Sequence, residues 1–194
     1  MPASNDNTAP SGPVFTFSSS LNPLNVNLNT YLSKHPTVAR LIVCAIVIHR
    51  NSRVLLVQRA ATDGFPLCWE CPGGGVDTQD ATILHALGRE LKEETGLGMT
   101  HVRALVDDTT EFEGREGVWR KITCLVEVDQ ADGDKETPDV TLEPFEHQDF
   151  LWASEEDVIS GNVGGKDVKF AYEVQRETIK VAFRIAAGGG GCGS

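Results

Sequence analysis

Three glutamates carry the strongest chemical signal in this chain. Glu90, Glu93 and Glu94 are spaced i, i+3 and i+4, so all three carboxylates leave the same side of a helix. Acids at this spacing repel one another, and near a helix C-terminus the macrodipole costs each exposed charge about 0.3–1 kcal/mol. A compensating cation is therefore expected. Mg²⁺ fits, because it binds a few carboxylates and takes its remaining oxygens from water and substrate phosphates.

The helix that carries these acids is predicted from Ala81 to Thr95. Asp80 is a residue type that caps helix N-termini, and Gly96 stands where a C′ glycine would end the helix. Three leucines at i, i+3 and i+7 give the helix an apolar stripe that is rotated away from the acids: Leu84, Leu87 and Leu91. The pattern predicts an amphipathic helix with one side packed and the acidic side free.

An acidic side alone would suit a solvated surface helix, which is the more common reason for such a pattern. The surroundings favour a ligand site instead. A short strand is expected around residues 69–71, and the segment Pro72–Gly75 breaks regular structure directly after it. Glycine backbone lets a ligand approach closely, and the acids lie on the helix that follows this break.

The acids and the glycine run together resemble the Nudix box, G-x5-E-x7-R-E-U-x-E-E-x-G-U, where U is aliphatic. The matching positions are Gly75, Arg89, Glu90, Leu91, Glu93, Glu94, Gly96 and Leu97. Every fixed position is filled at the right spacing except the first glutamate, which is Ala81. The flanking segments 55–59, 69–74 and 146–152 are also similar to the family, so the resemblance covers about residues 38–186. The residues around the box are most similar to those of fungal Nudix proteins.

This resemblance implies an α/β fold with a mixed β-sheet between α-helices. It also implies Mg²⁺ or Mn²⁺ held by Glu90 and Glu94, with help from Glu93 and a backbone carbonyl near Gly74. The metal and nearby arginines would offset charge on a diphosphate while a metal-bound or Glu-activated water attacks phosphorus. Gly74 and Gly75 would lie against the substrate.

The same resemblance assigns roles outside the metal. Arg89 would orient the glutamates through a salt bridge, and the catalytic base would be Glu93 or Glu146. Arg59, at the end of its strand, either reaches a substrate phosphate or is an edge-strand solubility residue. The remaining basic and histidine residues are read as surface or structural positions: Arg120 and Lys121 facing outward from a strand, and His85 and His147 without ligands beside them.

Ala81 is the departure that matters most. In the family the first box glutamate often acts indirectly, through water-mediated metal contact or loop stabilisation, so its loss is expected to weaken activity rather than abolish it. Asp80 is adjacent and is expected to substitute in part, since it has the G-x5 spacing when counted from Gly74. The change nevertheless keeps open a Nudix-fold binding module without turnover.

The substrate is left open between a nucleoside diphosphate derivative and a non-nucleotide diphosphate such as an isoprenyl diphosphate. The box does not separate these, because recognition of the base or tail depends on variable loops. We expect those loops at residues 62–66 and 111–117.

Composition limits the remaining classes. A net charge of −11 argues against non-specific binding to nucleic acid or anionic membranes. The N-terminus lacks the features of a signal or transit peptide, and no apolar stretch approaches a membrane span, so a cytoplasmic protein is expected, as monomer or homodimer.

Cys68 and Cys71 form a C-x2-C pair that is interpreted as two core thiols in preference to a zinc site. We expect a partly disordered arm over residues 1–37, a catalytic domain over 38–187 and a flexible Gly-rich tail over 188–194.

Overall fold

The computed structural model describes residues 14–49, 52–129 and 137–188. The strands are β1 (Thr16–Phe17), β2 (Val38–His49), β3 (Arg53–Arg59), β4 (Trp69–Glu70), β5 (Met99–Gly114), β6 (Gly117–Val128), β7 (His147–Ser154), β8 (Asn162–Val163) and β9 (Lys166–Asp167). The helices are the 3₁₀-helix η1 (Ser19–Leu24), α1 (Leu28–Lys34), α2 (Ile83–Thr95), α3 (Glu155–Ser160) and α4 (Val174–Gly188).

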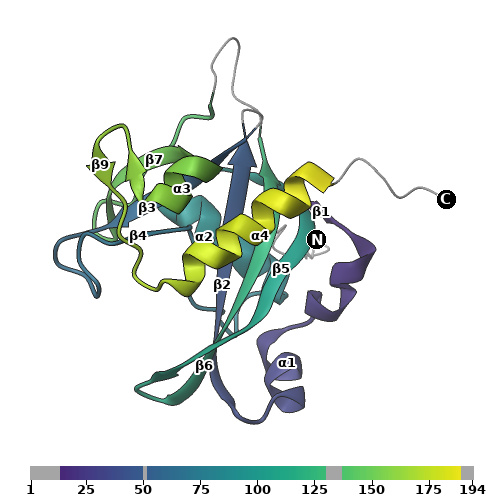
Figure 1. Cartoon of the computed structure of the whole chain (residues 1–194). Helices are drawn as coiled ribbons and strands as arrows, with labels where there is room; N and C mark the ends of the chain where they lie inside the picture. The colour runs from purple at the N-terminus through teal and green to yellow at the C-terminus, as the bar shows by residue number, and fades with distance from the viewer. Residues whose placement is uncertain (1–13, 50–51, 130–136, 189–194) are drawn as a thin grey trace, which may run out of the picture.

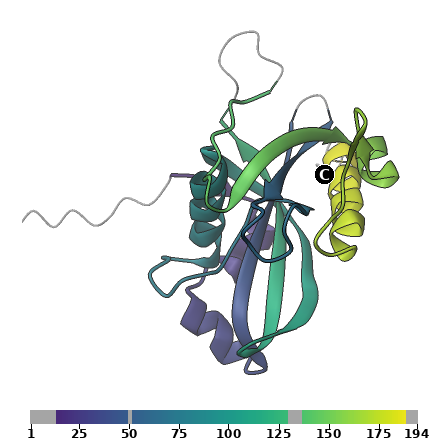
Figure 2. The ribbon, with the colours of Figure 1, turned by 90° about the vertical axis from the view of Figure 1, so that its left-hand side faces the viewer.

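A seven-stranded sheet forms the centre of the protein, in the order β1-β5-β6-β2-β3-β4, with β7 also paired to β3. Strands β2 and β6 run parallel, whereas β3 is antiparallel to β2, β4 and β7. Figure 1 shows these strands passing between the helices, and Figure 2 shows α2 on one side of the sheet and α4 on the other. The predicted α/β fold, a mixed sheet between helices, is confirmed.

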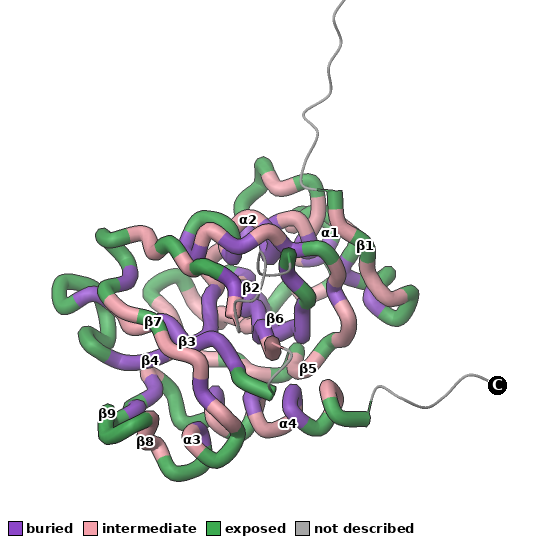
Figure 3. Tube along the Cα trace, turned by 90° about the horizontal axis from the view of Figure 1, so that it is seen from above, coloured by how far each residue is buried: buried purple, intermediate pink, exposed green. Residues whose placement is uncertain are grey.

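Strand β2 lies at the centre of the core because its apolar run is buried on both faces. Successive residues alternate between two hydrophobic clusters: Val43, Ala45 and Val47 face the α2 side, whereas Cys44 and Ile46 face the α4 side. Figure 3 shows buried positions concentrated along β2 and β3. This period of two fixes which side chains of β2 face each layer.

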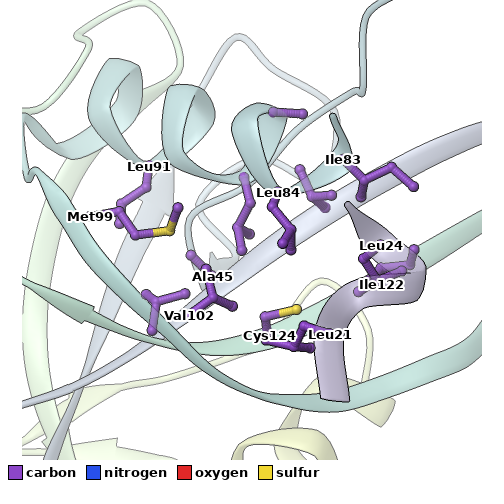
Figure 4. Packing of buried hydrophobic residues seen from close by; sticks show 14 of the residues in the cluster. Leu21, Leu24, Ala45, Ile83, Leu84, Leu91, Met99, Val102, Ile122 and Cys124 are labelled. Carbon is purple, nitrogen blue, oxygen red and sulfur yellow. The ribbon is translucent and has the colours of Figure 1, made fainter. Parts of the chain in front are cut away.

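The apolar stripe of α2 packs against the sheet as the leucine spacing predicts. Leu84, Leu87 and Leu91 are each at most 1% exposed. Figure 4 shows Leu84 and Leu91 directed toward β2 and β5. Burial of one such side chain contributes roughly 1.5–3 kcal/mol, so this stripe anchors the helix and sets the rotation of its acidic side.

The described part of the N-terminal segment also joins this core. Leu21, Leu24 and Tyr31 are buried in the cluster beneath α2, and residues 14–37 contain β1, η1 and α1. The first thirteen residues and residues 189–194 of the expected tail lie outside the described residues. No helix in the described ranges is long and apolar enough to cross a membrane.

Two sequence-based predictions of local structure were wrong. The expected variable loop at 111–117 is mostly strand, because β5 continues to Gly114 and β6 begins at Gly117. Phe112 and Trp119 face each other across this hairpin with ring centroids 5.9 Å apart, and such cross-strand aromatic pairs stabilise a sheet. The cap of α2 is Thr82, whose side chain accepts a hydrogen bond from the His85 N–H, and not Asp80.

Candidate active site

The loop before α2 lies directly against β2. The Val43 N–H donates to the Gly74 carbonyl (2.9 Å), and the Ala45 N–H donates to that of Pro72 (2.8 Å). A Cβ on Gly73 would stand 2.1 Å from the Val43 carbonyl oxygen, closer than any side chain tolerates. Glycine is therefore required for this close approach.

Glu94 is the most buried acid of the site, at 5% exposure. One of its oxygens, Oε2, accepts a hydrogen bond from the Gly73 N–H (2.8 Å). Burial raises the pKa of Glu94 well above its usual range. The hydrogen bond from the Gly73 N–H lowers this pKa, whereas repulsion from other carboxylates, Glu70 first among them, raises it further. The glycine loop thus holds a carboxylate where its charge is unfavourable without a cation.

Glu90 faces the same space from one turn earlier on α2. A Cβ on Gly74 would meet its Oε2 at 2.5 Å, so the loop and this carboxylate are in close contact. Burial raises the pKa of Glu90, Arg89 lowers it, and repulsion from Glu93 and Glu146 raises it again. Both Glu90 and Glu94 therefore belong to one group of mutually repelling acids.

Arg89 connects the helix to the loop. Its guanidinium makes a two-pronged ion pair with Asp80, with Nε–Oδ1 2.9 Å and Nη2–Oδ2 3.0 Å. It also donates to Glu90 (2.8 Å), Glu93 (2.9 Å) and the Gly75 carbonyl (2.9 Å). Five hydrogen bonds on one planar group fix its position, and with it the rotamer of Glu90.

Asp80, which forms the ion pair with Arg89, directly precedes Ala81. Burial opposes its ionisation, yet hydrogen bonds from Arg89 and from the Asp77 N–H lower its pKa below the usual range. Asp80 lies two residues before the N-cap Thr82, so its carboxylate binds Arg89 and does not cap the helix. An ionised carboxylate is thus held against Arg89 one residue before the position that the Nudix box reserves for glutamate.

The late loop and the start of β7 bring two further groups to the acids. Ligand atoms of Glu94, Glu146 and His147 all lie within 4.8 Å of one another. His147 is 3% exposed, and its Nε2 lies 3.4 Å from Glu70 Oε1. The expectation that no other ligand lies beside His147 was wrong, because the β3–β7 pairing brings residue 147 opposite Arg59 and so back to the site.

Glu93 points differently from its two neighbours on the helix. Its side chain is 58% exposed and pairs with Arg89. It is not among the described residues that line the cavity above Glu90 and Glu94. The i, i+3, i+4 spacing gave a common side of the helix, but the Arg89 pair turns this carboxylate outward.

A cavity of about 610 Å³ opens over the glycine loop, Glu90, Glu94 and Glu146. Its wall also contains three basic side chains, Arg40, Arg59 and Lys121. Arg59 pairs with Glu70 (2.5 Å) and with Asp63. The predicted outward orientation of Lys121 was wrong, because this residue is turned into the cavity wall by its register opposite Ile42 of β2. Arg120 instead pairs with Glu111 (2.6 Å) on the neighbouring strand.

The donor set suits an oxygen-preferring divalent cation. Glu94 and Glu146 supply carboxylate oxygens and His147 a ring nitrogen within one small space, and Glu90 lies beside them. Mg²⁺ favours oxygen ligands, and Mn²⁺ accepts an imidazole as well. Cys68 and Cys71, in contrast, are buried free thiols and belong to no metal-binding group among the described residues.

Comparison with known proteins agrees with this geometry. The NUDIX domain family matches residues 38–174. A CTP pyrophosphohydrolase of Escherichia coli strain K12 is 30% identical over 131 residues, which cover 65% of this chain and 84% of that protein. An RNA pyrophosphohydrolase of Halorhodospira halophila is 45% identical over 60 residues, which cover 31% of this chain and 30% of that protein.

Solved structures show the same fold. The MutT protein from Methanosarcina mazei Go1 aligns with a TM-score of 0.57 and 24% identity, over 76% of this chain and 94% of that one. The NUDIX domain of Shewanella oneidensis NrtR, in complex with ADP ribose, aligns with a TM-score of 0.57 and 19% identity, over 83% of this chain and 99% of that one. The family match covers most of the chain, and the chain therefore belongs to the Nudix family of hydrolases, which act on phosphoric anhydrides.

Proposed function

We propose that this protein is a metal-dependent pyrophosphohydrolase that cleaves the diphosphate of a nucleoside diphosphate derivative. The observation that carries the proposal is the opposition of charge inside one cavity. Its wall contains the mutually repelling carboxylates of Glu90, Glu94 and Glu146, and also the basic side chains of Arg40, Arg59 and Lys121. Carboxylates hold a cation, and basic side chains attract phosphate oxygens, so the cavity has both halves of a diphosphate site.

In this proposal Glu90 and Glu94 hold the metal, with Glu146 and His147 next to them. A bound Mg²⁺ or Mn²⁺ would neutralise phosphate charge and lower the pKa of a coordinated water. Arg89 is a positioning residue that keeps Glu90 in place. Arg59 binds phosphate, and Gly74 and Gly75 let the diphosphate lie close to the backbone.

The proposed base is Glu146. Its carboxylate lines the cavity within 4.8 Å of the Glu94 carboxylate, whereas Glu93 faces solvent. Glu146 takes the proton of the attacking water, the water oxygen bonds to phosphorus, and the bond from phosphorus to the bridging oxygen breaks. The leaving phosphate keeps that electron pair, so the step needs no further reactant.

Nucleotide substrates are favoured over other diphosphates by two observations. The named relatives are a CTP pyrophosphohydrolase and RNA pyrophosphohydrolases. The cavity wall also contains five aromatic side chains, which suit a planar base: Phe65, Phe112, Trp119, Phe145 and Tyr172. The loss of turnover that Ala81 suggests is opposed by the ion pair between Asp80 and Arg89.

A substrate panel tests the proposal. Nucleoside triphosphates, sugar nucleotides and an isoprenyl diphosphate are assayed for phosphate or pyrophosphate release with Mg²⁺, with Mn²⁺ and with EDTA. Metal-dependent release is expected from nucleotides, and Glu94→Gln should reduce it by about 10²-fold or more, since even groups behind metal ligands cost 10–100-fold. Glu177→Gln, an exposed acid on α4, is the matched control. Wild type and Glu94→Gln that are equally inert would reject the proposal and leave a binding module.

A further inference from the structure

Arg59, to which the proposed function assigns phosphate binding, is already bound to acceptors of the protein itself. Its Nε donates to the Gly64 carbonyl (2.5 Å), its Nη1 to Glu70 (2.5 Å) and its Nη2 to Asp63. One positive charge is thus paired with two negative charges, and this group repels an approaching phosphate. A phosphate gains from Arg59 only when one of the two carboxylates moves away.

The two carboxylates differ in how firmly they are held. Glu70 belongs to strand β4, its side chain is 15% exposed, and its Oε1 also lies 3.4 Å from His147 Nε2. Asp63 belongs to the loop between β3 and β4, residues 60–68, and its side chain is 39% exposed. Its second oxygen accepts a hydrogen bond from the Gly64 N–H (2.6 Å), which is part of the same loop. Asp63 is therefore the carboxylate that can leave together with its loop.

The loop that carries Asp63 has a strained backbone. Phe65 and Leu67 have φ values of 54° and 61°, in the left-handed region that large side chains rarely adopt. Both side chains are about half exposed, so burial holds them only in part. Arg59 ties the loop down from inside the cavity, through Asp63 and the Gly64 carbonyl. Strained residues persist where surrounding contacts hold them, so loss of the Asp63 contact favours release of the loop.

We infer that Asp63 is a competitor of the substrate built into the protein: it occupies Arg59 in the resting state, and a substrate phosphate replaces it and frees the loop. The inference rests on the proposed function, because it concerns the regulation of the same site. A phosphate of the substrate carries at least the single negative charge of a carboxylate, and a metal held by the acids of the cavity would bind it in addition. The apparent affinity for substrate is then the intrinsic affinity reduced by the fraction of protein in which Asp63 blocks Arg59.

Binding of imidodiphosphate with Mg²⁺ tests this competition without hydrolysis, because the bridging nitrogen of this pyrophosphate analogue resists cleavage. Asp63→Asn keeps the size of the side chain and its acceptor for the Gly64 N–H but removes the charge. We expect the variant to lower the apparent Kd in titration calorimetry by about two- to fivefold, the range of one partly exposed ion pair.

Asp149→Asn is the matched control. The Asp149 side chain is 40% exposed and pairs with Lys166, and it accepts a hydrogen bond from the next backbone N–H, that of Phe150 (2.8 Å). It is not among the described residues of the cavity wall. Asp149→Asn should therefore leave the apparent Kd for imidodiphosphate unchanged, and a thermal melt checks that both variants are folded.

Amide hydrogen exchange of residues 62–67 tests the release of the loop. The Leu67 N–H donates to the Arg59 carbonyl (3.2 Å), and the Gly64 N–H donates to Asp63. In wild type, imidodiphosphate with Mg²⁺ should speed the exchange of this segment by the same factor of about two to five, because the ion pair that stabilises the loop is lost. A ligand that merely covers the loop would slow this exchange. In Asp63→Asn the segment should exchange faster without ligand and respond little to it.

The possible results separate this inference from the proposed function. If the analogue binds and the loop responds as expected but no substrate of the panel is hydrolysed, the proposed function fails and the role of Asp63 stands. If hydrolysis is metal-dependent but the analogue slows or does not change exchange of residues 62–67, the role of Asp63 is wrong and the function stands. Equal tightening by Asp63→Asn and Asp149→Asn, no tightening by Asp63→Asn, or no binding of the analogue to either protein would also overturn the inference.

Discussion

Replacement of Glu94 by glutamine should make the metal-free protein more stable while removing its activity. Glu94 is buried, and Glu70, Glu90 and Glu146 all repel its charge. The pKa of Glu94 is raised by burial and by these neighbours, so the folded protein binds a proton at Glu94 more readily than the unfolded chain does. The free energy of unfolding therefore falls as the pH rises from the pKa of Glu94 in the unfolded chain to its higher pKa in the folded protein. Above that higher pKa the free energy of unfolding stays at its reduced value. The amide oxygen of the introduced glutamine would still accept the Gly73 N–H bond, so that contact is kept.

The magnitude follows from the distance between charges. Ligand atoms of Glu94 and Glu146 lie within 4.8 Å. Two unit charges at that distance repel by about 1 kcal/mol in water and about 3.5 kcal/mol at an effective dielectric constant of 20. Glu146 is exposed, so the lower figure applies. A gain of about 1 kcal/mol raises Tm by roughly 2–4 °C in a protein of this size.

Thermal melts at pH 8 with EDTA and with Mg²⁺ measure both halves of this prediction. Wild type should gain Tm on addition of Mg²⁺, since a ligand at 100 times its Kd stabilises by about 2.7 kcal/mol. Glu94→Gln should start higher and respond little. Glu177→Gln is the control, because that acid is exposed and pairs with Lys180. A lower Tm for Glu94→Gln in EDTA, with an unchanged Mg²⁺ response, would refute the assignment of Glu94 as a repelled metal ligand.

Three further predictions concern the loop, the ion pair and the base. Asp80→Asn should lower kcat/KM by about 10–100-fold, because it removes the charged contact with Arg89. Asp77→Asn is the matched control and should leave kcat/KM unchanged. Equal activity of the two variants would disprove the role of Asp80. Gly73→Ala should lower the free energy of unfolding by more than about 2 kcal/mol in urea melts, because the added Cβ would lie 2.1 Å from the Val43 carbonyl oxygen. Gly64→Ala is the control and should change the free energy of unfolding little, because a Cβ there meets nothing within 4 Å. Glu146→Gln should reduce kcat more than Glu93→Gln at saturating metal, and the reverse order would transfer the base to Glu93.

Much of the fold and part of the site follow from local pattern in the sequence. The buried run of β2, the leucine stripe of α2 and the glycine at position 96 each act within one element. Gly96 has a φ of 72°, as the predicted helix end requires. Glu90 and Glu94 were predictable for the same reason, because their spacing within one helix fixes their common side.

Groups that come together through chain pairing were not predictable in this way. The prediction that Lys121 faces outward was wrong because an alternating strand does not tell which of its faces is covered. The acids beside His147 were not predictable because only the register of β3 with β7 returns this residue to them. These positions depend on tertiary pairing, about which the local spacing of residues carries no information.

Ala81 and Asp80 show why one departure from a family pattern can matter less than another. A shift of one residue within a helix turns a side chain by about 100°, so Glu90 and Glu94 can act only from their own positions. Residues 80 and 81 precede the first helical residue, Ile83, and belong to an irregular loop whose backbone is not bound to that period. The loop therefore presents Asp80 to Arg89 from one position earlier. The glutamate that the Nudix box has at position 81 is missing, but the ionised carboxylate of Asp80 binds the Arg89 guanidinium.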